Sequence, residues 1–360
     1  MRNGCFRALA ALIAALLLGL LPAAAETDGD CVYTLVDWQG NRLTRVGGRI
    51  YVDDAYIAGD NACFRVVSVD DAAKIAVAEY AGMAETDQAA LAGFYALAEG
   101  DSKKRVAMYS THSDESYVPG DGEASKWENA GIYDVGERLQ AALEKRGIET
   151  IYSKDTFLPH DADAYTRSRR AAEELLRQNP DALLDIHRDA VPAEEYETEV
   201  DGEDISKVRL FVGRSNPNAA ANRAFAQQLK KAADEQYPGL VKDIFIGKGN
   251  YNQELYPHAL LLEFGSHETD KDKAMASTDY MASVLDSVLY GGGAQARDVG
   301  AGSVVKGIGW VIGLAAIAAV VYAFASAGSL KGAGRKLKRH VSELTGGLVG
   351  GKDDDKGGTR

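Results

Sequence analysis

The sequence predicts an α/β fold over 103–292, built on a mostly parallel sheet with helices on both faces. Two observations lead to this prediction. Short apolar segments alternate there with longer segments of helical periodicity, and polar side chains follow several apolar segments at their carboxyl ends. Ligands bind to such sheets beyond the carboxyl ends of the strands, so these polar residues indicate a functional site.

The expected elements alternate regularly along this region. Strands are expected at Arg105–Tyr109, Glu149–Tyr152, Ala182–Ile186, Val208–Val212, Lys242–Ile246 and Ala259–Glu263. Helices are expected between them at Tyr133–Arg146, Ala164–Gln178, Asn218–Glu235 and Lys271–Leu289. This alternation is typical of parallel strands joined by helical crossovers.

The amino terminus has the pattern of a cleaved signal peptide, expected at 1–25. Arg2 and Arg7 precede an apolar run at 8–21, and small residues then lead to a cleavage site after Ala25. The run is short for spanning about 30 Å of hydrocarbon, so cleavage is favoured over an uncleaved anchor.

A single transmembrane helix is expected at 308–327, after a linker at 293–307. The stretch carries no charge and has roughly the 20 residues that a bilayer requires. The tail at 328–360 begins with a cluster of Lys and Arg residues, which marks the cytoplasmic side. The lipid bilayer is therefore an expected partner, and the region before the helix is expected to face outward from the cell membrane.

The formal net charge is −13, and the two ends of the chain are basic. The outward-facing region is therefore more acidic than the chain as a whole. Nucleic acid and anionic lipid surfaces bind basic patches, so neither is expected as a partner of this region.

A small β module is expected at 26–85, before the α/β region. Its apolar segments are short, and Gly-Gly, Gly-Asp-Asn and Asp-Asp turns separate them, as in hairpins. It contains no cluster of histidines or carboxylates, so we expect it to bind or position a partner. A connector at 86–102 follows, with a helix expected at Asp87–Ala98.

Two of the three cysteines, Cys31 and Cys63, lie in this module. A pair of cysteines in an oxidising compartment predicts one disulfide. Closing a loop of about 30 residues would contribute roughly 3 to 4 kcal/mol in the chain-entropy model. We therefore expect a disulfide that stabilises the module.

Three expected strands end in residues that zinc enzymes use. His112 follows the first strand, His187 follows the third, and Glu263 ends the last. Catalytic zinc takes three protein ligands and keeps a position open for water, and a carboxylate accepts the proton of that water. A lone histidine at a strand end is more often structural, but three such positions on one sheet favour a Zn²⁺ site. Glu263 is the expected general base.

The third zinc ligand has two candidates, and Glu115 is favoured over Glu128. Glu115 lies three residues after His112, an HxxE spacing that zinc carboxypeptidases use. Glu128 precedes the first expected helix, where its charge would also complement the helix dipole. The expected ligand set is therefore His112, Glu115 and His187.

Further polar residues lie close to these positions in the sequence. Arg188 is expected to bind a substrate carboxylate, or else to pair with Asp185 or Asp189. The two aspartates can also orient His187, as metal-bound histidines usually require. Asn252 is expected to line the substrate cleft.

The region at about 103–290 resembles the stage II sporulation protein P amidases. The matching segments are THSDESYVP at 111–119, YDVGERLQAALEKRGI at 133–148, HDADAYTRSR at 160–169, LLDIHRDA at 183–190 and NQELYPHALLLEFGS at 252–266. That family is similar to the wider zinc-dependent N-acetylmuramoyl-L-alanine amidases, whose sheet places two His and two Glu around one zinc ion. The resemblance implies that DIHRDA contains the second zinc-binding histidine and that peptidoglycan is the substrate.

The resemblance also implies the reaction, which is hydrolysis of the amide between the lactyl group of N-acetylmuramic acid and L-alanine during sporulation and engulfment. Glu128 matches the place before the first helix where the wider family commonly has a ligand. His160 lies in a family-like segment, although capping the helix that begins at Ala164 is an equal interpretation. Members of the family are usually held by an N-terminal membrane segment, whereas this chain carries its expected anchor at the other end.

Two other functions are compatible with the sequence. One is a zinc endopeptidase or carboxypeptidase that acts on the stem peptides, because ligand spacing does not distinguish one amide from another. The other is an inactive wall-binding scaffold, against which the intact set of two histidines and two glutamates argues. The sequence identifies no protein activator.

The two apolar segments predict a topology that protease protection can measure. Protease added outside intact cells should remove the region before the helix and leave a membrane fragment that carries the tail from Lys331 onward. Digestion of the tail, with the outward region protected, would show that the orientation is reversed.

Overall fold

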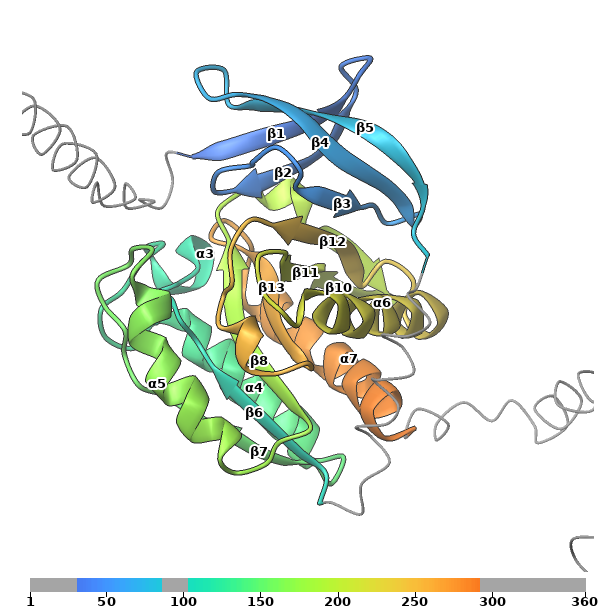
Figure 1. Cartoon of the computed structure of the whole chain (residues 1–360). Helices are drawn as coiled ribbons and strands as arrows, with labels where there is room; N and C mark the ends of the chain where they lie inside the picture. The colour runs from blue at the N-terminus through green and yellow to red at the C-terminus, as the bar shows by residue number, and fades with distance from the viewer. Residues whose placement is uncertain (1–30, 86–102, 292–360) are drawn as a thin grey trace, which may run out of the picture. The chain divides into compact units, whose positions relative to one another are not determined.

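The computed structural model describes residues 31–85 and 103–291, which belong to one compact unit (Figure 1). The expected signal peptide, connector helix and transmembrane helix lie outside the described residues. Within those two ranges, no helix is long and apolar enough to cross a membrane.

The α/β region forms the elements that the sequence predicts, with bounds close to the predicted ones. The strands are β6 (Arg105–Tyr109), β7 (Glu149–Tyr152), β8 (Ala182–Asp189), β11 (Val208–Gly213), β12 (Val241–Gly247) and β13 (Ala259–Ser266). The helices are α3 (Val118–Asp121), α4 (Gly131–Glu144), α5 (Ala164–Leu176), α6 (Ala219–Gln236) and α7 (Lys271–Tyr290). The α/β architecture is confirmed.

The sheet is mixed, because β11 runs antiparallel to its neighbour β13. The pairs β7-β6, β6-β8, β8-β13 and β11-β12 are parallel. Between β8 and β11 the chain passes through a 3-10 turn, Ala193–Glu195, and a hairpin of β9 (Glu197–Val200) and β10 (Glu203–Ser206). No helix crosses the sheet in the described stretch between β8 and β11. The chain therefore enters β11 at the end of the sheet where it left β8, and β11 runs in the opposite direction to β8.

The strands of the N-terminal module continue the same sheet. They are β1 (Val32–Asp37), β2 (Arg42–Gly47), β3 (Ala55–Ile57), β4 (Ala62–Asp70) and β5 (Ile75–Met83). β3 pairs antiparallel with β12, and Ile57 lies opposite Ile244. The described residues thus form an 11-stranded sheet in the order β2-β1-β5-β4-β3-β12-β11-β13-β8-β6-β7 (Figure 1).

The two faces of the sheet are covered differently. Helices α4, α6 and α7 pack on one face through a core that includes Leu139, Phe225 and Leu285. On the other face, α5 packs over β6 and β8 with Ala172 in the core, and the module packs against Phe245 of β12. Polar side chains of β8, β13 and β11 lie on this second face between α5 and the module.

The expected disulfide is absent, because Cys31 and Cys63 are both free. Cys31 packs with the cluster that contains Tyr33, whereas Cys63 in β4 packs against the cluster that contains Ile57. The two cysteines therefore belong to different hydrophobic clusters. The sheet itself, continued through β3 and β12, joins the module to the α/β region.

Candidate metal centre

His112, Glu115 and His187 form a candidate metal site. Each offers one ligand atom, and these atoms lie within 4.8 Å of one another. The Nδ1 atoms of His112 and His187 are both 3.3 Å from Oε1 of Glu115. Two imidazole nitrogens and one carboxylate oxygen are a donor set that catalytic metal sites use, with a further position left for water.

The register of two parallel strands brings these residues together. Tyr109 at the end of β6 lies opposite Asp185 in β8, so the loop after β6 runs beside His187. Thr111 fixes this loop by donating from its backbone nitrogen and its hydroxyl to the Asp185 carboxylate, at 2.8 and 2.6 Å. The loop then carries His112 toward β8.

Asp185 also orients the His187 ring. Its Oδ1 lies 2.9 Å from Nε2 of His187, at ion-pair distance but without hydrogen-bond alignment. The other ring nitrogen, Nδ1, is left facing Glu115. A carboxylate behind a metal-binding imidazole is the usual arrangement that holds such a ring in place.

His112 lies in an aromatic setting. Its ring stacks on that of His160 with 3.8 Å between centroids, and it meets Tyr165 edge-on at 5.4 Å. His160 is held in turn by Asp114, whose Oδ1 lies 3.0 Å from Nδ1. His160 therefore lies at the site, and the N-cap position of α5 is occupied by Asp163.

Electrostatics favour an ionised Glu115. Burial opposes ionisation, but His187 and Arg188 outweigh it and hold the pKa of Glu115 well below its usual range. Arg188 donates its backbone nitrogen to Oε2 at 2.9 Å, which leaves Oε1 for the two histidines. Burial likewise opposes protonation of His187, yet Asp185 and Glu115 together raise its pKa well above the usual value. Burial lowers the pKa of His112.

Glu263 lies beside this site. It is opposite His187 in the β13-β8 register, and both line a cavity of about 600 Å³. Its Oε2 is buried and has no hydrogen-bond partner among the described residues. Burial, followed by the nearby Asp189, raises the pKa of Glu263 well above its usual range. Two residues after it, Gly265 takes a left-handed φ of 75° where the register shifts, and a Cβ there would lie 2.8 Å from Ser206 Oγ.

The structure separates the two candidates for the third ligand. Glu115 is buried within the cluster, whereas Glu128 is exposed and is not part of it. The Glu115 carboxylate accepts a hydrogen bond from the backbone nitrogen of Arg188, the residue after His187. This contact forms between the loop after β6 and the end of β8, which the fold brings together. Glu115 as the third zinc ligand stays a prediction, and its place in the candidate cluster agrees with the HxxE spacing.

Arg188 and Asn252, the predicted substrate-binding residues, both line the cavity and are both buried. Arg188 donates from its guanidinium to Ser116 O, in the loop after β6, at 3.3 Å and to Ala124 O, between α3 and α4, at 2.9 Å. Asn252 donates its amide to Tyr165 O at 3.0 Å and to Ser168 Oγ at 3.1 Å. Their role toward a substrate stays a prediction.

Three residues that line or support this site were missed in the sequence. Tyr165 lies in the family-like segment at 160–169, so that motif was a usable signal. Arg209 and Lys248 lie in segments with no motif of their own, and pairing across the sheet brings them to the site.

The model of the Stage II sporulation protein P (SpoIIP) family matches residues 68–286. The chain belongs to this family. A curated member of the family, Stage II sporulation protein P of Bacillus subtilis (strain 168), is 28% identical over 207 residues, which is 52% of each chain. The chain thus spans about half the length of that relative.

Solved structures with similar chains are N-acetylmuramoyl-L-alanine amidases. One is AmiC2 of Nostoc punctiforme, which is 16% identical with a TM-score of 0.35 and covers 53% of this chain and 97% of its own. Another is the CwlD amidase from Clostridioides difficile in complex with the GerS lipoprotein, which is 9% identical with a TM-score of 0.35 and covers 52% and 98% of the two chains.

Substitution of the candidate ligands should lower the affinity for Zn²⁺. We expect His112→Ala, His187→Ala and Glu115→Ala to lose more than the roughly 10- to 100-fold that mutation of an outer partner costs. Equilibrium dialysis followed by metal analysis measures this. The matched control is Glu128→Ala, which should bind as the unchanged chain does. A full equivalent of tightly bound zinc in both histidine variants would rule the site out.

Proposed function

We propose that the protein is a zinc-dependent N-acetylmuramoyl-L-alanine amidase that hydrolyses peptidoglycan. The observation that carries the proposal is the convergence of His112, Glu115 and His187 on one point, with the unpartnered Glu263 carboxyl oxygen beside them. Membership of the stage II sporulation protein P family supports a role during sporulation. The choice of the lactyl to L-alanine amide rests on the resemblance described above.

Zn²⁺ held by these three residues would supply Lewis acidity and a water of lowered pKa. The protein's part is to keep the Glu115 carboxylate ionised and to hold the His187 ring in position. Glu115 is held ionised by His187 and Arg188. Asp185 fixes the His187 ring so that Nδ1 faces Glu115.

Glu263 is the residue that would transfer the proton. Its pKa is raised by burial and by Asp189, which is the direction that a general base working near neutral pH requires. It would accept a proton as the nucleophile attacks the amide carbon and return it to the leaving amine. Because its Oε2 has no protein partner among the described residues, that atom is available for this exchange.

Arg188 and Asn252 border the same cavity and are proposed to shape the substrate site. Arg188 donates to the backbone of the segment between β6 and α4, and Asn252 donates to helix α5, so both would act by holding the cavity wall in position. We further infer that the protein acts outside the cytoplasm, anchored to the cell membrane by the segment at 308–327. This placement agrees with a peptidoglycan substrate.

Substitution of Glu263 tests the mechanism. Glu263→Gln preserves size but cannot accept a proton at neutral pH, so hydrolysis of purified peptidoglycan should fall by about 10²- to 10⁴-fold. Zinc content and melting temperature should stay close to those of the unchanged chain, because the residue is not a ligand. Retention of most of the activity would remove Glu263 from the mechanism.

Mass spectrometry of the same digests identifies the bond that is cleaved. New amino termini on L-alanine support the amidase, whereas cleavage within or between stem peptides supports the endopeptidase. A chelator should abolish release of either product. Release that persists without metal would contradict the proposal.

A further inference from the structure

The N-terminal module forms one wall of the cavity that contains the candidate metal centre. Gly47 at the end of β2 and Tyr51 beyond it both line this cavity. The backbone nitrogen of Gly47 donates to Asp189 Oδ1 at 2.9 Å, and a Cβ on Gly47 would lie only 2.6 Å from that oxygen. This part of the module therefore lies directly against the strand that carries His187.

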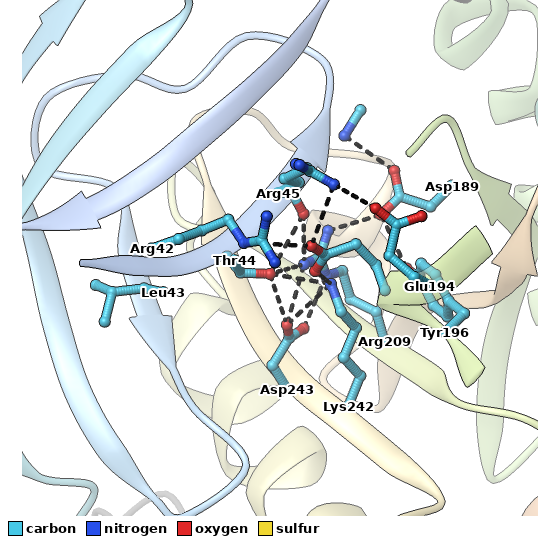
Figure 2. A network of polar contacts seen from close by, with 12 residues as sticks. Arg42, Leu43, Thr44, Arg45, Asp189, Glu194, Tyr196, Arg209, Lys242 and Asp243 are labelled. Carbon is cyan, nitrogen blue, oxygen red and sulfur yellow. Dashed lines mark hydrogen bonds and ion pairs between the residues drawn. The ribbon is translucent and has the colours of Figure 1, made fainter. Parts of the chain in front are cut away.

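A network of buried polar side chains holds the wall in place (Figure 2). Arg209 donates to Asp189 Oδ2 and to Asp243 Oδ1, each at 2.7 Å. It also donates to Thr44 Oγ1 at 2.8 Å and to Arg45 O at 2.9 Å, both in β2. Because Arg209 and Asp243 are buried, these bonds fix the position of β2 over the sheet.

The loop after β12 is fixed to the same wall. Arg214 donates to Asp54 Oδ1 and to Val52 O, each at 2.9 Å. The Tyr251 hydroxyl donates to Lys248 O at 2.9 Å. The backbone that carries the Lys248 side chain is therefore held through its carbonyl oxygen.

Two cations flank the Tyr51 ring where the module meets this loop. Lys248 Nζ lies 4.6 Å and Arg49 Cζ lies 5.0 Å from the ring centroid. Asp71 neutralises Arg49, with contacts of 3.1 and 2.5 Å. Lys248 is exposed and lines the cavity, and no carboxylate of the described residues lies within 4.0 Å of its ammonium. In a chain of net charge −13, this leaves a local positive charge at the cavity.

We propose that Lys248, with Tyr51 and Arg49 beside it, forms a subsite that binds a carboxylate of the peptide part of the substrate. The inference rests on the proposed function, since it takes a peptide-bearing substrate as given. A cavity of about 600 Å³ is large enough to hold the groups on either side of a scissile amide. A peptide carries at least its C-terminal carboxylate, which an ammonium group binds through charge-assisted hydrogen bonds. The module is thus part of the substrate site.

The test compares two synthetic muramoyl peptides that differ only at the C terminus, one a free carboxylate and the other an amide. Binding is measured by calorimetry on the zinc-loaded full chain that carries Glu263→Gln, so that neither peptide is hydrolysed. The free carboxylate should bind about fivefold more tightly, as expected for a solvated ion pair worth about 1 kcal/mol. In the added variant Lys248→Gln this preference should vanish, and in Lys248→Glu it should reverse. Lys145→Glu, which makes the same charge change at the exposed C-cap position of α4, should keep it.

The outcomes separate this inference from the proposed function. A preference that survives Lys248→Glu, or that is missing in the first place, overturns the subsite. If the subsite is overturned but the chain with Glu263 intact still cleaves the lactyl to L-alanine amide, the amidase proposal stands without the subsite. A preference that depends on Lys248 in a chain that cleaves neither peptide would instead support the subsite and contradict the amidase.

Discussion

The buried Arg209 guanidinium is the interaction on which the rest of this structure depends. It lies between Asp189 and Asp243, in a row of side chains that runs across four strands in the order His187, Glu263, Arg209, Asp243. Removing one partner from a buried charge pair costs about 3–5 kcal/mol, because the remaining charge is left uncompensated. Without Arg209, the buried carboxylates of Asp189 and Asp243 would lose the cation that they share. The same side chain holds β2, so it couples the module to the half of the sheet that carries the candidate metal centre.

This arrangement explains how an acidic protein can gather carboxylates at one site. Asp185 and Glu115 are balanced by the histidines and by Arg188, and Asp189 and Asp243 are balanced by Arg209. Glu263, which lies opposite His187, has a carboxyl oxygen that is buried and has no hydrogen-bond partner among the described residues. The charge balance thus leaves the Glu263 carboxyl group available for proton transfer, which is the chemistry that the proposed function needs.

Local sequence patterns predicted the elements of the α/β region. They also predicted that the two histidines lie at the ends of strands, because each histidine closely follows its apolar strand segment in the chain. They also favoured Glu115 over Glu128, since the HxxE turn is local. Pairing between distant segments was not predictable in this way, and it produced the antiparallel β11, the continuation of the sheet through β3 and the Arg209 network.

The expected disulfide was inferred from compartment alone and had no geometric support. The role of the module could not be predicted from its sequence either, because its residues include no cluster of histidines or carboxylates. It contributes to the cavity only through contacts between Gly47 and Asp189 and between Thr44 and Arg209. Such contacts depend on the tertiary structure, so composition and periodicity do not reveal them.

X-ray absorption spectroscopy of the zinc-loaded full chain tests the central claim most directly, because it identifies the atoms that bind the metal. Ligation by His112, Glu115 and His187 predicts two imidazole nitrogens and a carboxylate oxygen at about 2.0–2.2 Å, with water completing the coordination. In His187→Ala the imidazole contribution should fall by half. A sulfur shell at about 2.3 Å, or a shell of oxygens without imidazole, would contradict the account.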